Sequence, residues 1–163
     1  MGTPFSEVYN RFLGKITDDM YMELTPQDTL RDMRNLLMDA IPGFEFPRVD
    51  LYDYIIIDTE NALEDLSCFV AELTSEEINI LAILMMISWT QRQVTSIENT
   101  RMKYSSSDFK FTSQANHLAK LLNLLKETQR QSLHMQRLYR RRKNDGTGYK
   151  SNWSVLRETS ALD

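Results

Sequence analysis

The chain has 163 residues, of which 42% are hydrophobic and 26% charged, with 5 glycines and 4 prolines. This length fits one domain with a substantial core, and the composition predicts a folded, soluble, helix-rich protein. The single cysteine, Cys68, excludes a disulfide framework and favours an intracellular protein or particle. The longest apolar run, residues 78–89, is too short to span a bilayer, and we expect no secretory leader.

The net charge of −4 conceals an asymmetry between the two halves of the chain. Residues 1–75 carry 15 acidic and 5 basic side chains, whereas residues 76–163 carry 8 acidic and 14 basic ones. Opposite charges of this kind can attract a second copy head to tail, or a partner of one sign. The alternative is that the two halves fold against each other and largely neutralise one another.

Two helices are expected near the start of the chain. The first covers residues 4–13, with Thr3 as its N-cap, proline at its first position and one apolar stripe at i, i+3, i+4 and i+7. The second begins at Thr25, which is again followed by proline, and ends at Pro42-Gly43. Together they predict a small helical body.

Residues 44–73 show a different pattern, in which β-branched and aromatic residues occur in short runs. Pro47 restricts any strand there to a sheet edge. We expect an insertion that forms a small β-hairpin or an extended lobe, with CFVAEL, residues 68–73, as one strand. A short helix over residues 60–66 is equally allowed.

The helical pattern then becomes strong. Thr74 and Glu77 form a capping box, TSEE, at the start of a long helix. Its first half, residues 78–89, is apolar on nearly every side, which predicts the central helix of the fold.

A second long helix follows a short loop, and the two should form an antiparallel hairpin that projects from the body. Ser113 is its expected cap, and at roughly 30 residues it would be about 45 Å long. Gln129 and Ser132 interrupt its apolar stripe. The helix therefore packs either on a neighbouring subunit or on the chain's own N-terminal helices.

No combination of residues in the sequence indicates catalysis, and we expect no enzyme, no cofactor and no metal site. His117 and His134 lie 17 positions apart on one predicted helix, about 25 Å along its axis, too far apart to share a metal. Nucleotide-binding, zincin and serine-hydrolase motifs are absent. The acidic pairs at 18–19, 58–60 and 64–65 are expected to be solvated.

The end of the second long helix carries a basic run made of Arg137, Arg140, Arg141, Arg142 and Lys143. A helix C-terminus favours such charges by itself. The functional alternative is contact with phosphates or with an acidic protein surface. The acidic net charge and the lack of a nucleic-acid-reading signature argue against specific DNA recognition.

Residues 144–163 form a separate tail. Two glycines provide a hinge, and apolar residues then alternate with polar ones in GYKSNWSVL. This spacing is typical of an extended arm that adds a strand to another sheet, with Trp153 as its anchor. The alternative is that Trp153 packs on this chain's own helices. The predicted docking residues are Tyr149, Trp153, Val155 and Leu156.

The order of these elements resembles the head–tail connector proteins of tailed bacteriophages, the adaptor or head-completion class that forms a ring beneath the portal. The matching parts are the helical body of residues 4–41, the central helix TSEEINILAILM, the long hairpin that reaches Lys143, and the arm GTGYKSNWSVLRE. The likeness is one of architecture and covers most of the chain. It includes no diagnostic short motif and does not account for residues 44–73.

This resemblance implies a structural virion protein with a connector domain at residues 1–143 and a docking arm at residues 144–163. It would assemble in the host cytoplasm into a ring of about twelve copies at the virion neck, without a membrane. The ring would bind the portal protein above and a further neck or tail-completion protein below. The arm would dock on the portal, and the basic run would meet acidic portal surface or, non-specifically, the DNA in the channel.

A rival hypothesis from another class is a cellular helical-bundle module that binds nucleic acid non-specifically through the basic helix end. A third is a metalloenzyme that uses carboxylates. Neither rival accounts for the C-terminal arm.

Overall fold

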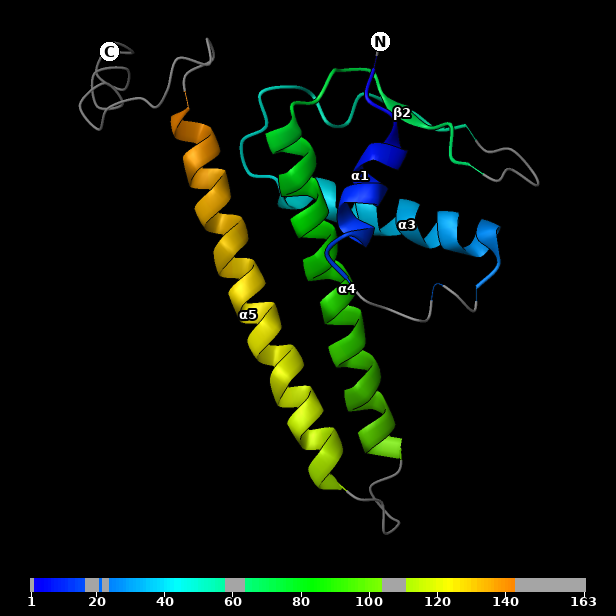
Figure 1. Ribbon diagram of the computed structural model, residues 1–163, viewed down its shortest axis with the longest axis vertical. Helices are drawn as coiled ribbons and strands as arrows, with labels where there is room; N and C mark the ends of the chain where they lie inside the picture. Colours follow the sequence, from blue (N-terminus) through cyan, green and yellow to red (C-terminus); the bar gives the residue numbers. More distant parts are fainter. Residues whose placement is uncertain (1, 17–20, 22–23, 58–63, 104–110, 143–163) are drawn as a thin grey trace.

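The computed structural model describes residues 2–16, 21, 24–57, 64–103 and 111–142 (Figure 1). In this part of the chain the fold is mainly helical with one small antiparallel hairpin, which confirms the predicted fold class. The elements are α1 (Phe5–Leu13), α3 (Pro26–Ala40), the 3-10 turn η1 (Ile41–Gly43), β1 (Tyr54–Ile55), β2 (Cys68–Phe69), α4 (Ser75–Lys103) and α5 (Phe111–Arg141).

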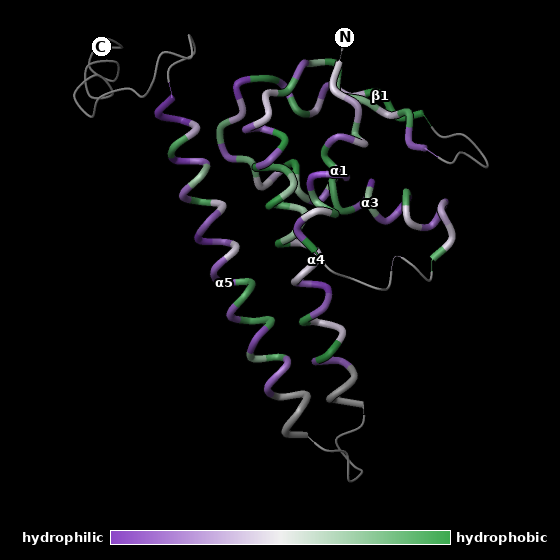
Figure 2. The backbone as a smooth tube through the Cα atoms, in the orientation of Figure 1, coloured by the Kyte–Doolittle hydropathy of each residue, from purple (hydrophilic) through white to green (hydrophobic). Residues whose placement is uncertain are grey.

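Helix α4 is the centre of the molecule, as its apolar first half predicts. Ile80, Leu81, Ala82 and Met85 are fully buried on different sides of this helix, against α1, α3 and α5. Beyond this half, α4 and α5 continue as a pair past the body (Figure 1). Hydrophilic residues recur along α5 (Figure 2), so its apolar face is narrow. Because α4 and α5 extend together beyond the body (Figure 1), the predicted projecting hairpin is confirmed.

The capping box at the start of α4 is also confirmed. The backbone N–H of Thr74 donates to Glu77 Oε2 at 2.7 Å, and that of Glu77 donates to Thr74 Oγ1 at 3.3 Å. Thr25 caps α3 in the same way, since its Oγ1 accepts from the N–H of Asp28 at 3.2 Å. These two starts were readable because the capping side chain lies next to the helix that it caps.

The predicted cap of α1 is wrong. Pro4 occupies the N-cap position, and the hydroxyl of Thr3 instead accepts from the N–H of Leu73 at 2.7 Å. The cause is that residues 3–5 run antiparallel to β2: the N–H of Phe69 donates to Thr3 O and the N–H of Phe5 donates to Ser67 O, both at 2.9 Å. Pro4 bridges Cys68 where no N–H is required, so its missing donor costs nothing.

Two further local predictions concern the cap of the last helix and the alternative short helix over residues 60–66. α5 begins at Phe111, so Ser113 lies inside the first turn and is not its cap. The first N–H groups of a helix have no intrahelical partner and can be satisfied by groups other than a capping side chain. A helix can therefore start before the residue that looks like its best cap. Of the alternative short helix, residues 64–66 are not helical and residues 60–63 lie outside the described part. No helix in the described ranges is long and apolar enough to cross a membrane.

Candidate interaction surfaces

The C-terminal end of α5 is fastened to the body through Tyr139, which is 1% exposed. Its hydroxyl donates to the carboxylate of Glu77 on α4 and accepts from the backbone N–H of Arg48 at 3.0 Å. The Arg48 guanidinium lies 4.6 Å from the centre of the Tyr139 ring and donates to Tyr139 O at 2.9 Å. Burial and the bond to Glu77 raise the pKa of the Tyr139 hydroxyl, which keeps it a neutral donor.

Gln136 lies one turn before Tyr139 on α5 and is also hydrogen-bonded to the body. Its Oε1 accepts from the N–H of Glu45 at 2.8 Å, and its Nε2 donates to Gly43 O at 3.1 Å and to Ser132 Oγ at 3.2 Å. Of the two residues expected to interrupt the stripe, Ser132 is buried and hydrogen-bonded to Gln136, whereas Gln129 is exposed. Among the described residues, α5 packs mainly on α4 and on residues 43–48, rather than on the N-terminal helices as one alternative expected.

The predicted basic run does not form one patch. Arg142 Nη1 lies 2.9 Å from Glu76 Oε2 in an ion pair, and the guanidinium of Arg140 lies 4.5 Å from the centre of the Phe46 ring. Arg137 and Arg141 are exposed, and Lys143 lies outside the described residues. Two of these arginines thus serve the chain's own packing.

A longer basic surface runs along the outer side of α5, away from α4. Lys126, Arg130, Arg137 and Arg141 are exposed at i, i+4, i+11 and i+15, which places them on one helical face over about 22 Å. Leu133 lies between them and is 44% exposed. We call these five residues the α5 stripe. The helical spacing in the sequence contains this pattern, whereas the predicted basic run covered only the end of the helix.

The hairpin of β1 and β2 has one buried and one exposed face. Tyr54 and Phe69 oppose each other in the ladder and pack on Phe5, with ring centres 6.1 Å and 4.7 Å from the Phe5 ring. Strand alternation places Ile55, and the side chains in phase with it, on the other face. These side chains are exposed: 52% for Ile55, 41% for Ile57, 58% for Leu66 and 48% for Val70. We call these four residues the hairpin face. Exposed apolar groups gathered on one face mark an interaction site.

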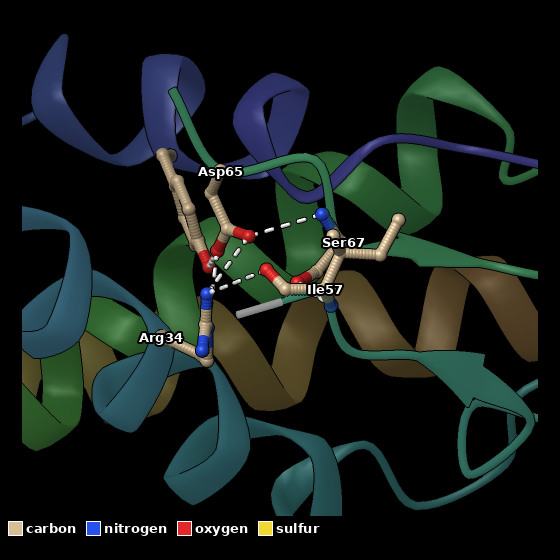
Figure 3. Close-up of polar contacts among 5 residues, drawn as sticks. Arg34, Ile57, Asp65 and Ser67 are labelled. Atoms are coloured by element: carbon tan, nitrogen blue, oxygen red, sulfur yellow. Dashed lines mark hydrogen bonds and ion pairs between the residues drawn. The ribbon is translucent and has the colours of Figure 1, made fainter. Parts of the chain in front are cut away.

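A buried carboxylate holds the hairpin onto the helical body (Figure 3). Asp65, 5% exposed, accepts from Tyr9 Oη at 2.9 Å, Arg34 Nε at 3.2 Å, Arg34 Nη2 at 3.0 Å and the N–H of Ser67 at 3.0 Å. Burial acts to raise the pKa of Asp65, but the hydrogen bonds from Arg34, Ser67 and Tyr9 outweigh it and hold this pKa below its usual range. The expectation that this carboxylate is solvated is therefore wrong.

The described residues bring no catalytic groups together. His117 and His134 are exposed on α5, and Cys68 is half-buried in β2. Among the residues that the structure describes, no cluster of His, Cys, Asp or Glu could hold a metal ion. An open depression of about 730 Å³ lies beside α4, but its one arginine, Arg92, is paired with Asp39 on its wall at 3.7 Å. Surfaces, rather than a cleft, are the candidates for function.

The predicted docking residues of the arm, Tyr149, Trp153, Val155 and Leu156, lie outside the described residues and stay a prediction. Comparison with models of protein families, with curated proteins and with solved structures gave no match.

Proposed function

We propose that this chain is a structural subunit of a bacteriophage head–tail connector, which forms a ring at the virion neck between the portal and a further neck or tail protein. The observation that carries the proposal is the long α4–α5 pair that continues past a small helical body (Figure 1). Two paired helices with a narrow apolar face bury little apolar area and so add little stability to an isolated domain. In an assembly the same extension offers additional area for contact with a neighbouring subunit.

Three further features support an assembly role. The hairpin face exposes four large apolar side chains, and the α5 stripe exposes four cations on another part of the surface. The C-terminal arm has the alternating pattern of a segment that binds by strand addition. The hairpin face and the α5 stripe lie outside the described core, which supports a role for both surfaces in an assembly.

The test of the proposal is electron microscopy of particles from the native source, with the position and rotational symmetry of this chain determined directly. We expect a closed ring of about twelve copies stacked on the portal. A chain that is absent from particles, or present only as a monomer or dimer without ring partners, would overturn the proposal.

The arm is tested separately by truncation. A chain that ends at Gly146 should fold normally and fail to join particles, because the predicted anchor Trp153 is lost. A chain that ends at Glu158 keeps the alternating segment and is the matched control, which we expect to assemble normally. Normal incorporation of the shorter chain would show that the arm does not dock on the portal.

The second candidate function is non-specific nucleic-acid binding, which the length of the α5 stripe favours. It predicts affinity that falls steeply with salt and is lost when Lys126, Arg130 and Arg137 are replaced by alanine. Equal affinity of this variant and the unaltered chain for duplex DNA would exclude the stripe as a phosphate-binding surface.

A further inference from the structure

We propose that the hairpin face of one copy binds the α5 stripe of a second copy of this chain. The contact would be the side-by-side subunit contact of the proposed ring, and only closure into a ring rests on the proposed function. The contact itself follows from the chemistry of the two surfaces.

The apolar part of the contact comes from the hairpin face. Six of the eleven exposed large hydrophobic side chains among the described residues lie between residues 52 and 70, so exposure is concentrated there rather than scattered. The fold does not need the four side chains of the hairpin face, because the opposite face of the hairpin already packs on Phe5. Removing them from water stabilises a complex by about 25 cal/mol for each Å² that is buried.

The charged part of the contact identifies the partner. Asp53 lies next to β1, where its backbone oxygen accepts from the N–H of Val70 at 3.0 Å, and Glu64 lies two residues before Leu66. The rim of the hairpin face is therefore acidic. The α5 stripe has the complementary pattern, with Leu133 in the middle and exposed cations one turn away on either side, Arg130 and Arg137.

The two surfaces also agree in size. Residues 53–57 span about 13 Å of extended chain, and the part of the stripe from Arg130 to Arg137 spans about 10 Å of helix. Leu133 can thus enter the apolar centre of the hairpin face while the flanking arginines reach the carboxylates at its rim. Apolar centres with charged rims are the usual anatomy of protein interfaces.

A nucleic acid fits the stripe less well. Leu133 lies at its centre, where a phosphate-binding surface gains nothing from a leucine. The stripe is a single row of cations, and Arg130 within it forms an exposed ion pair with Glu127 at 3.7 Å. Arg140 and Arg142 beside the stripe are engaged with Phe46 and Glu76 of the same chain. The excess of 15 acidic over 5 basic side chains in residues 1–75 further repels a polyanion.

The positions of the two surfaces decide the kind of assembly. The hairpin and α5 lie on opposite sides of α4 (Figure 1), and among the described elements the main packing partner of α5 is α4. One copy can therefore offer its stripe to one neighbour and its hairpin face to another at the same time. Such a heterologous contact repeats from copy to copy, and it gives a ring where the rotation closes.

The experiment uses two full-length variants, each of which blocks one surface. Leu133→Glu/Arg137→Glu blocks the stripe, and Ile57→Lys/Leu66→Lys blocks the hairpin face. All four positions are exposed, so the fold should survive, and circular dichroism verifies it. Leu24→Glu/Arg31→Glu makes the first pair of changes at exposed positions outside both surfaces and is the matched control. Sedimentation velocity over a concentration series measures self-association.

We expect the unaltered chain and the control to self-associate, and each blocked variant alone to lose at least about tenfold in association constant, as for the loss of an interface anchor. Mixing the two blocked variants should restore one intact contact and give a heterodimer that grows no further. A monomeric unaltered chain, or blocked variants that stay apart when mixed, would overturn the inference. Loss of salt-dependent DNA binding by the stripe variant, without any self-association, would assign the stripe to nucleic acid instead.

These outcomes separate the inference from the proposed function. Heterodimer formation by a chain that is absent from particles leaves the contact established and the connector proposal refuted. A ring in particles, combined with blocked variants that do not pair, refutes the contact alone.

Discussion

Replacement of Asp65 by asparagine tests how the hairpin is held on the helices. The side chain keeps its shape, but the carboxylate that pairs with both Nε and Nη2 of Arg34 is lost. Breaking a buried ion pair by removing one partner costs roughly 3–5 kcal/mol, because the other charge stays buried without compensation. The Arg34 side chain is 18% exposed, so water relieves part of this penalty, and we expect a loss of about 3 kcal/mol.

Urea unfolding followed by circular dichroism measures this loss, and its pH dependence gives a second check. The pKa of Asp65 in the folded chain lies below its ordinary value, so its contribution is present above about pH 4 and is lost as the pH falls through the folded-state pKa. The difference between the unaltered chain and Asp65→Asn should therefore be largest near neutral pH and shrink towards pH 2.

Two further variants make the comparison sharper. Glu64→Gln removes the same charge from an exposed neighbour and should change the free energy of unfolding by less than about 0.5 kcal/mol. Adding Arg34→Met to Asp65→Asn should recover part of the loss, because no unpaired cation remains. A deficit below about 1 kcal/mol at neutral pH, or one that does not shrink as the pH falls through the acidic range, would refute the reasoning.

Other substitutions probe the remaining contacts through the same unfolding measurement. Gly2→Ala would place a Cβ 1.9 Å from Phe69 O, so residues 2–5 must shift; we expect a loss of about 1–3 kcal/mol, and an unchanged melting temperature would contradict this. Tyr139→Phe leaves Oε1 of the buried Glu77 without the hydroxyl that donates to it and should cost about 1–3 kcal/mol; a neutral result would mean that water replaces the hydroxyl. Ser132→Leu forces a larger side chain into a site that is 3% exposed and should cost about 1–3 kcal/mol, whereas stabilisation would reveal unfilled space between α4 and α5.

Features that depend on neighbouring residues could be predicted from the sequence. The caps at Thr25 and Thr74 act within three residues, and the apolar first half of α4 carries its burial in its composition. The small hairpin inside residues 44–73 was also expected, because short runs of β-branched and aromatic residues have few other uses in a helical protein.

Features that depend on contacts between distant segments could not be predicted. Asp65 looked like part of a solvated acidic pair, because nothing near it in the sequence indicates that Arg34 and Tyr9 meet it in space. The role of Thr3 was misassigned for the same reason, since its acceptor oxygen serves Leu73 rather than the helix that follows. At such positions a contact with a distant segment replaces the structure that the neighbouring residues would favour.

The candidate surfaces fall between these two cases. The period of the α5 stripe is visible in the sequence, but its meaning depends on which face of α5 packs on α4, and burial of Thr128, Ser132 and Gln136 is what fixes that face. The hairpin face required the strand register, which the sequence left open. Which face of α5 and of the hairpin is exposed therefore depends on how these elements pack, and the sequence pattern alone does not determine it.

The way in which each surface is anchored bears on the assembly that the proposed contact would form. The hairpin is tied to α1 and α3 through Asp65, and the end of α5 is tied to α4 and residues 43–48 through Tyr139 and Gln136. Both anchors bear on the same core, so the two surfaces keep a fixed relative orientation. In a heterologous assembly this orientation sets the rotation between neighbours, and hence whether the chain of copies closes or grows as a filament. Buried hydrogen-bonded anchors at both surfaces are what a closed ring of one size requires, because a loosely held hairpin or helix end would allow a range of rotations.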